Sequence, residues 1–321
     1  MQVVLGRSLI TCLFFFLLSC SDQEHANQAL RVGMHKWIGY ETLTIAEELG
    51  AYQDANLRLV RLVSASDLMH AIRSENLEAA TLTLDETLIL ISEGFELDVL
   101  AVIDYSMGGD AVIAKEPINQ LSDLKGKTIA VEFVAVGAIM LDALLDAAQL
   151  TLDDVTVIPC TIDQHTECFK SADAVITFEP YRTQLIEMGG KVIFDSSAIP
   201  ERIVDVLAVK RSAIAPHKKA IQTLVNGYCQ AQRYSKSNYE ETRRIVSRSL
   251  GVSPDNVDQA YKLVKIPDIE ENINLLSSNP SKLDEAARSL ASFMQKRSLL
   301  KEIKVARLAN DLFIQGCKHG A

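Results

Sequence analysis

The sequence has little that would support contact with a polyanion. Its 321 residues include 32 lysines and arginines against 42 aspartates and glutamates, which gives a formal net charge of −10. No block of lysine or arginine interrupts this acidic balance. Nucleic-acid binding needs a clustered basic surface, because contacts to phosphate supply most of the affinity. We therefore expect no nucleic-acid partner.

The familiar signatures of catalytic and metal sites are also missing. The sequence contains no HExxH, GxSxG, P-loop or GxGxxG pattern, and each of these patterns gathers groups that a particular chemistry requires. The six histidines lack the spacing of metal ligands, and no two cysteines have CxxC spacing. Only His35, which follows the first expected strand, is placed to overhang a ligand site. We expect no catalytic residue, no cofactor and no metal.

Long apolar runs are absent except near the N-terminus, where residues 9–18 follow Arg7 and precede Cys20. This run has about 10 residues, whereas a membrane-crossing helix needs about 20, so it suits the core of an export signal. Leu17-Leu18-Ser19-Cys20 resembles a bacterial lipobox, in which the cysteine is lipidated after cleavage. We expect a signal peptide over 1–19, lipidation at Cys20 and a lipid-anchored linker over 20–27. An ordinary cleaved signal or a buried N-terminal strand is the alternative.

Four cysteines remain after Cys20, and export would place them where disulfides persist. Cys160 and Cys168 are close enough in sequence to close a small loop. Cys229 and Cys317 could tie C-terminal helices together. Free buried thiols are the alternative for both pairs.

Short β-branched runs alternate with helical patterns along most of the chain. Strands are expected at 30–34, 57–63, 79–83 and 97–103, and again at 128–132, 155–158, 174–177 and 191–194. Helices are expected between them at 43–49, 67–73, 86–92, 138–148, 164–170 and 181–187, and then at 220–235, 240–250, 256–264 and 282–293. This alternation predicts an α/β fold with mainly parallel sheets, right-handed crossovers and a helical C-terminal segment.

Two strand-like passages, near 102–114 and 203–210, lie where the chain would cross between the α/β halves. Two crossings indicate that one lobe is inserted into the other. We expect residues 28–112 plus 204–321 to form lobe 1 and residues 113–203 to form lobe 2. The carboxyl ends of the strands would face a cleft that can close on a hinge.

Polar and aromatic residues gather at these expected strand ends. The candidate ligand-binding residues are Trp37, Tyr40, Asp85, Ser106, Asp110, Glu132, Gly137, Glu179 and Asp205. A loop aromatic such as Trp37 can stack on a planar or cationic ligand. Each candidate also has a structural alternative. Trp37 would plug a loop, Asp85 would cap a helix, Ser106 and Asp110 would form a turn, and Glu179 would be a first-turn charge.

The sign of the charged candidates favours one kind of ligand. Five of them are carboxylates, whereas Lys36 is the only basic residue near an expected strand end. Carboxylates that are buried without a partner are costly, so a cleft with several of them suits a cationic or hydrogen-bond-donating ligand. The same count weighs against nitrate or a simple sulfonate.

The ordered set of strand-end segments resembles a known family. Lys36-Trp37-Ile38-Gly39-Tyr40-Glu41, Leu82-Thr83-Leu84-Asp85-Glu86, Asp104-Tyr105-Ser106-Met107-Gly108-Gly109-Asp110 and Val175-Ile176-Thr177-Phe178-Glu179-Pro180 look like segments of NMT1-like solute-binding proteins, the nitrate/sulfonate/taurine and thiamine-pyrimidine-precursor group. The resemblance implies a two-lobed periplasmic binding protein fold of type II. It also implies ligand contacts at Trp37, the Asp85 loop, Ser106–Asp110, the 132–137 turn and Glu179.

The sequence departs from two branches of that group. Ala135-Val136 stands where anion-binding members often carry hydroxyl residues, which puts sulfonate and nitrate in doubt. The related pyrimidine synthase has a Cys-rich iron-binding motif, which Cys160 and Cys168 do not reproduce.

Together these observations give a functional hypothesis. We expect a non-catalytic, lipid-anchored, monomeric periplasmic protein that captures a small amine or nitrogen heterocycle and delivers it to the permease of an ABC importer. Three alternatives stay open. They are a sensor subunit for a membrane receptor, an enzyme of the pyrimidine-synthase type, and an anion binder that uses Lys36 and the helix start at Gly137.

Overall fold

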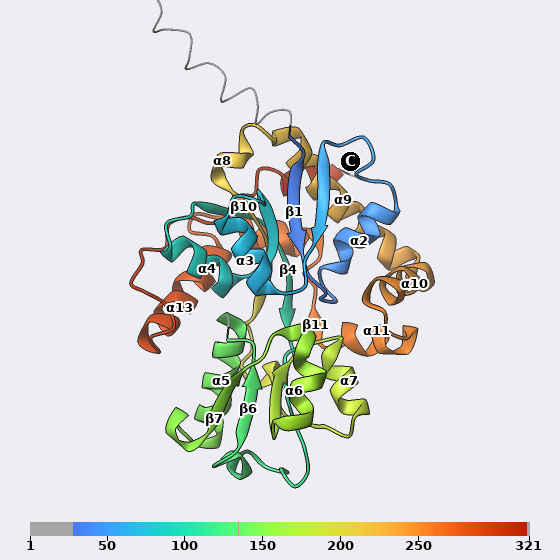
Figure 1. The fold of residues 1–321 in the computed structure, drawn as a ribbon. Coiled ribbons are helices and arrows are strands. Elements are labelled where there is room, and N and C mark those ends of the chain that lie inside the picture. The colour runs from blue at the N-terminus through green and yellow to red at the C-terminus, as the bar shows by residue number, and fades with distance from the viewer. Residues whose placement is uncertain (1–27, 134, 320–321) are drawn as a thin grey trace, which may run out of the picture.

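The computed structural model describes residues 28–133 and 135–319. The expected signal peptide, Cys20 and the linker over 20–27 lie outside the described residues. The described chain forms two stacked units, each built on its own sheet (Figure 1). We call the unit with the six-stranded sheet lobe 1 and the unit with the five-stranded sheet lobe 2. Within the described residues, no helix has both the length and the apolar character needed to cross a bilayer.

The sheet of lobe 1 has the strand order β11-β4-β10-β3-β1-β2. In its middle lie β3 (Ala79–Thr83) and β10 (Val204–Lys210), whose side chains are almost all buried. Short apolar runs of this kind are typical of strands covered on both faces. The remaining strands are β1 (Leu30–Met34), β2 (Leu57–Arg61), β4 (Leu97–Ser106) and β11 (Val264–Lys265).

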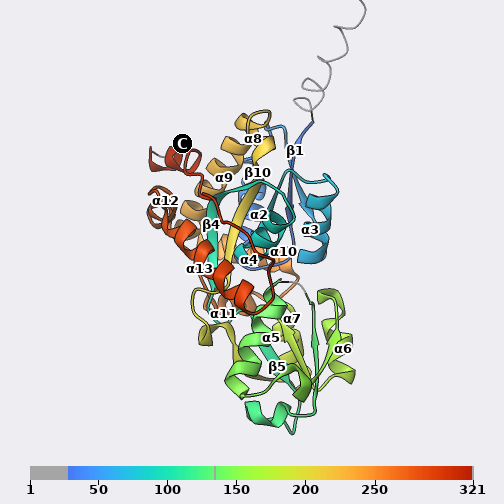
Figure 2. The same ribbon diagram turned by 90° about the vertical axis from the view of Figure 1, so that its left-hand side faces the viewer.

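Helices surround this sheet (Figures 1 and 2). Several start at residues whose side chains accept a free backbone N–H of the first turn, among them Ser64, Thr83 and Ser281. The helices are α2 (Glu41–Glu48), α3 (Ala65–Arg73), α4 (Leu84–Ser92), α8 (Arg211–Ile214), α9 (Lys218–Ser237), α10 (Tyr239–Leu250), α11 (Pro254–Tyr261), α12 (Ile269–Leu276) and α13 (Lys282–Lys296). The sequence pattern did not predict α8, α12 or β11 as separate elements.

Lobe 2 is smaller, and its sheet has the order β7-β6-β8-β5-β9. Its strands are β5 (Ala111–Ala114), β6 (Thr128–Val131), β7 (Thr156–Pro159), β8 (Ala174–Thr177) and β9 (Lys191–Asp195). Its helices are α5 (Ala135–Ala148), α6 (His165–Ser171) and α7 (Tyr181–Glu187). A disulfide joins Cys160, just after β7, to Cys168 in α6, which is the pairing that the sequence allowed.

The expectation of mainly parallel sheets is wrong, because both sheets are mixed. In lobe 1, β1 pairs in parallel with β2 and β3, but β10 runs antiparallel to both β3 and β4. In lobe 2, β5 runs antiparallel to β8 and β9. The physical reason is the crossing of the chain. β5 and β10 are the strands that enter a lobe from the other one, so each runs against the strands between which it inserts.

The two crossings between the lobes, which we call the hinge, are joined by hydrogen bonds. The first joins β4 to β5, so Ala111 and Val112 belong to the sheet of lobe 2, slightly before the expected boundary. The hydroxyl of Ser196 on the second crossing lies 2.8 Å from the hydroxyl of Ser106 and accepts a hydrogen bond from the Gly108 N–H at 2.7 Å. These bonds connect the segments about which the lobes would rotate relative to each other.

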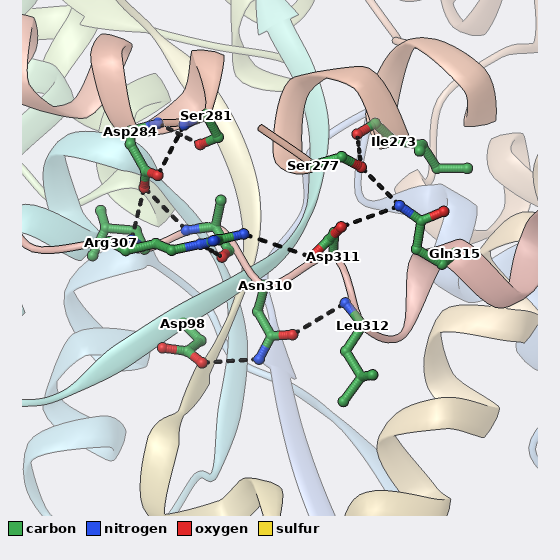
Figure 3. Close-up of polar contacts among 12 residues, drawn as sticks. Asp98, Ile273, Ser277, Ser281, Asp284, Arg307, Asn310, Asp311, Leu312 and Gln315 are labelled. Carbon is green, nitrogen blue, oxygen red and sulfur yellow. Dashed lines mark hydrogen bonds and ion pairs between the residues drawn. The ribbon is translucent and has the colours of Figure 1, made fainter. Parts of the chain in front are cut away.

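The C-terminal segment is bound firmly to lobe 1, and Figure 3 shows its polar contacts. Asp284 at the start of α13 accepts hydrogen bonds from the backbone N–H groups of Leu308 and Ala309, at 2.8 and 3.2 Å. Further along, Cys317 forms the second disulfide that the sequence allowed, with Cys229 of α9. The last described residues therefore complete the fold of lobe 1.

Candidate functional site

A cavity lies between the two lobes, at the ends of strands from both sheets. The space that the centre of a water-sized sphere can occupy in it is about 50 Å³, which is small beside the ~300–1,000 Å³ of typical small-molecule sites. Lobe 1 contributes residues that follow β1, β2 and β3 and that begin β10. Lobe 2 contributes the ends of β6 and β8 and the starts of α5 and α6. The lining residues are His35, Trp37, Tyr40, Ala65, Thr83, Glu86, Asp110, Val131, Glu132, Val136, Gly137, His165, Ile176, Thr177, Phe178, Ile203 and Asp205.

Aromatic rings from both lobes meet in this cavity. Phe178 of lobe 2 lies edge-on to Trp37 of lobe 1, with ring centroids 5.8 Å apart, and 5.6 Å from the ring of His35. His35 in turn is 5.1 Å from the ring of Tyr40. These rings give the cavity an apolar, polarisable wall that can face a planar or cationic group.

Four carboxyl groups also line the cavity, and no lysine or arginine does so among the described residues. The four are Glu86, Asp110, Glu132 and Asp205, and none of them forms an ion pair in the described part of the chain. Burial lowers the pKa of both lining histidines, His35 and His165, to about 4, so they are neutral at physiological pH. The cavity therefore has acidic groups without a counter-ion.

Asp205, which lines the cavity, lies beside a second buried carboxyl on the neighbouring strand. Asp205 of β10 is the register partner of Asp104 of β4. The Tyr40 hydroxyl donates to Asp205, and the Trp37 indole N–H donates to Asp104 at 2.9 Å. Burial, with the negative charge of Asp104, raises the pKa of Asp205 well above its ordinary range, and burial raises the pKa of Asp104 to about 7. The charge of Asp104 disfavours ionisation of Asp205, whereas a side-chain hydrogen bond from Asp205 favours the ionised form of Asp104 and lowers its pKa.

Asp110 and Glu86 complete the acidic wall of lobe 1. Burial raises the pKa of Asp110 to about 7, against the opposing effect of the nearby Ser106 hydroxyl. Glu86 accepts a hydrogen bond from the Thr83 backbone N–H at 2.9 Å, as part of the capping box that starts α4. Burial and the charge of Asp85 raise the pKa of Glu86 to about 8. These groups favour a ligand that brings positive charge or N–H donors.

The lobe 2 side of the cavity contributes a contact that spans the cleft. Glu132, just after β6, accepts a hydrogen bond from the hydroxyl of Ser66 in α3 at 2.6 Å. The same side holds His165, whose Nδ1 lies 2.8 Å from the Thr177 hydroxyl. Because Ser66 and Glu132 belong to different lobes, their bond forms only when the lobes are close.

The structure separates the nine candidate ligand residues into two groups. Those that line the cavity are Trp37, Tyr40, Asp110, Glu132, Gly137 and Asp205, and those that do not are Asp85, Ser106 and Glu179. The structural alternative for Asp85, that it caps α4, is wrong as well, because Thr83 is the N-cap and Asp85 lies inside the first turn.

Ser106 and Glu179 are engaged elsewhere. The Ser106 hydroxyl is part of the hinge bonding with Ser196. Glu179 accepts hydrogen bonds from the backbone N–H and hydroxyl of Thr183, at 3.2 and 3.0 Å, and pairs with Arg182 at 3.3 Å. Glu179 therefore neutralises Arg182 and supports the start of α7. This role is close to the structural alternative for Glu179, a charge at the first turn of a helix.

Sequence reasoning missed three of the more informative cavity residues, Glu86, His165 and Phe178. Glu86 lies three residues after Thr83, and this spacing indicates a capping box at the start of a helix. The spacing gives no sign that Glu86 also lines the cavity. His165 lies at the start of α6, and nothing in its local sequence marks it. His35 does line the cavity, as its position after the first strand suggested, whereas the Lys36 ammonium donates to the Leu250 carbonyl of α10.

A model of the NMT1-like family matches residues 23–251. A curated binding protein of Brucella abortus is 26% identical over 176 residues, which are 52% of this chain and 54% of that protein. The chain thus spans about half the length of the curated relatives it matches.

Solved structures cover nearly the whole chain. The ligand binding component of an ABC-type import system from Staphylococcus aureus, with zinc bound, has a TM-score of 0.74 at 13% identity over 91% of this chain and 99% of that one. The alkanesulfonate-binding protein SsuA from Xanthomonas axonopodis pv. citri, bound to MOPS, has a TM-score of 0.70 at 15% identity over 88% and 96%. The desulfurization enzyme DszB has a TM-score of 0.66 at 17% identity over 89% and 98%. The expected two-lobed periplasmic binding protein fold is confirmed.

Proposed function

The chain belongs to the NMT1-like family, and from this premise we propose that it is a periplasmic solute-binding protein that delivers a small molecule to an ABC importer. The ligand is a small amine or nitrogen heterocycle, held in the cavity between the lobes. The mature protein is a lipid-anchored monomer without catalytic activity. Proteins of the same fold that serve ABC-type import support this role, and the export signal expected at the N-terminus agrees with it.

The observation that carries the choice of ligand is the charge of the cavity wall. Four carboxyl groups line it, and no lysine or arginine does so among the described residues. An anion entering this cavity would lose its hydration and gain no counter-ion, whereas a cation would favour the ionised form of carboxyls whose pKa burial has raised. Lys36, the basic residue an anion would need, bonds to the Leu250 carbonyl instead.

Asp110 is the carboxyl best suited to bind the ligand directly. Asp205 already accepts from the Tyr40 hydroxyl, Glu86 from the Thr83 N–H and Glu132 from the Ser66 hydroxyl. The Asp110 carboxyl accepts from the Ser106 hydroxyl and its own backbone N–H, and it has the charge of Asp85 nearby but no bond to a described residue of lobe 2 or of the cavity wall. Its carboxylate can therefore accept a hydrogen bond from the ligand while the ring of the ligand rests on the aromatic wall.

The wall also supports a binding role over a catalytic one. Among the described residues that line the cavity, the only hydroxyl side chains are Tyr40, Thr83 and Thr177, and no cysteine or lysine is present. Tyr40 donates to Asp205, and burial raises its pKa well above the usual range, so it is a poor nucleophile.

A ligand screen followed by calorimetry tests this proposal. The purified protein is screened by thermal shift against amines, pyrimidines, amino acids, sulfonates and nitrate, since a ligand at a hundredfold excess over its Kd stabilises the folded state by about 2.7 kcal/mol. We expect stabilisation by amines or nitrogen heterocycles. Stabilisation by sulfonates or nitrate alone would refute the ligand assignment.

A matched pair of variants then locates the binding group. Asp110→Asn removes a cavity carboxyl, and Glu179→Gln removes one outside the cavity. Both residues are buried to a similar degree, with exposed fractions of 5% and 4%. Asp110→Asn should weaken ligand binding about 10- to 100-fold, because hydrogen bonds to charged groups contribute about 1.5–3 kcal/mol. Glu179→Gln should leave the affinity unchanged, and equal effects of the two variants would contradict the assignment.

A further inference from the structure

The Asp104 and Asp205 side chains form a buried pair that, among the described residues, receives hydrogen bonds only from neutral donors. They are register partners on adjacent antiparallel strands, and their exposed fractions are 0% and 3%. Asp205 lines the ligand cavity, whereas Asp104 lies behind it. Each carboxyl receives one neutral donor, from the Tyr40 hydroxyl and the Trp37 indole N–H respectively. The second oxygen of Asp104 is buried with no hydrogen-bond partner in the described structure.

The groups that face this pair from neighbouring elements supply no positive charge. They are His35 and Tyr40 after β1, Asp85 and Glu86 in α4, Asp110 at the hinge, Tyr228 in α9, and Glu132 and His165 across the cleft. The two histidines are neutral, because burial lowers the pKa of each to about 4. Neither aspartate forms an ion pair with a lysine or arginine in the described chain.

Two carboxyls in this position cannot both be ionised at moderate cost, because each charge is buried and opposes the other. Such pairs retain one proton between them and titrate as a unit. A positive charge placed beside Asp205 would stabilise the doubly ionised pair, so the pair would release the proton that it otherwise retains.

We propose that Asp104 and Asp205 share one proton in the ligand-free protein, and that a cationic ligand entering the cavity displaces this proton to solvent. This inference rests on the proposed function and narrows it, because it selects a ligand that binds as a cation over a neutral heterocycle. In this step the proton passes from the carboxyl pair to the buffer, and the positive charge of the ligand replaces the positive charge of that proton beside the pair. No covalent bond in the ligand changes.

Two measurable consequences separate cationic from neutral ligands. Binding of a cation releases at least one proton, and its affinity rises about tenfold for each pH unit over the range in which the free pair holds that proton. A neutral ligand binds without proton release, and its affinity does not rise with pH.

Proton release is measured by isothermal titration calorimetry. The probes are methylammonium and tetramethylammonium, whose charge is fixed near pH 6.5, together with the amines identified in the screen. Each titration is run in phosphate and in cacodylate, two anionic buffers, because their ionisation enthalpies differ and the difference in observed heat counts the protons. We expect the wild type to release at least one proton, because Asp110 and Glu86 in the same cavity can add to the proton of the pair. Asp104→Asn and Asp205→Asn should each lower the count clearly below that of the wild type, and Glu179→Gln should leave it unchanged.

A titration without ligand tests the pair by itself. Carboxyl carbon NMR of the labelled protein should show that the Asp104–Asp205 pair keeps a proton above pH 6. Ordinary titration of both residues near pH 4 would overturn the inference and leave the proposed function standing. Cation binding with no proton release would do the same. If no amine binds although the pair titrates as expected, the proposed function fails, and with it the displacement step.

Discussion

Replacing Asp110 with asparagine should stabilise the ligand-free protein while weakening ligand binding. Asp110 is buried beside other carboxyls, and burial raises its pKa from 3.8 to about 7. A raised pKa in the folded state means that the folded protein holds a proton which the unfolded chain releases. The wild type therefore loses stability as the pH rises from about 4 to about 7. Asparagine does not ionise, so the variant avoids this loss.

The size of the effect follows from the change in pKa. Each pKa unit corresponds to about 1.4 kcal/mol, so the rise from 3.8 to about 7 sets a ceiling of about 4 kcal/mol at pH 8. The asparagine amide also needs a hydrogen-bond partner, which reduces the gain. We expect Asp110→Asn to increase the free energy of unfolding by about 2–4 kcal/mol at pH 8 and to have little advantage at pH 4.

Urea denaturation of both proteins at pH 4, 6 and 8 measures this difference directly. The advantage of the variant should grow with pH, while calorimetry with an amine ligand shows weaker binding. A loss of stability that is the same at pH 4 and pH 8 would refute the reasoning, because it would show that the carboxyl contributes through its contacts and not through its ionisation. A residue that costs stability in order to bind is common at functional sites.

Three further predictions concern the cleft, the second disulfide and the N-terminus. Ser66→Ala removes the donor to Glu132 across the cleft, so ligand affinity should fall about 2- to 10-fold by calorimetry with an unchanged urea midpoint, since such a bond contributes about 0.5–1.5 kcal/mol. An unchanged affinity would mean that the contact is not part of the closed state. Replacing both Cys229 and Cys317 with serine opens a loop with a sequence separation of 88, and the free energy of unfolding should fall by about 2–5 kcal/mol in urea. A loss below 1 kcal/mol would argue that the disulfide adds little. Cys20→Ser should abolish the mass increase of lipidation and release the protein from membranes, whereas a wild-type protein of unmodified mass would contradict the lipobox.

Much of the local structure could be predicted from the sequence. The β-branched runs at Leu30–Met34, Ala79–Thr83 and Ala174–Thr177 are strands with the expected bounds. Their length and apolar character suit central strands and little else. Residues that follow strand ends, among them Trp37 and Asp110, do line the cavity, because strand ends converge at one edge of each sheet.

The sequence pattern could not predict whether the crossing strands pair in parallel or antiparallel with their neighbours. A β-branched run such as Val204–Lys210 looks the same whether its neighbours are parallel or antiparallel. Only the path of the chain through the other lobe makes β10 run against β3 and β4.

By itself, therefore, the sequence determined the alternation of elements, the two-lobed organisation and the acidic character of the cleft. Only the tertiary structure decided which strand-end carboxyls face the cavity. Glu179 forms an ion pair with Arg182, three residues further along the chain. Asp205 lies beside Asp104 on the adjacent strand and has no basic partner among the described residues. The Glu179–Arg182 pair is local, whereas Asp104 and Asp205 are far apart in the sequence and only the fold brings them together.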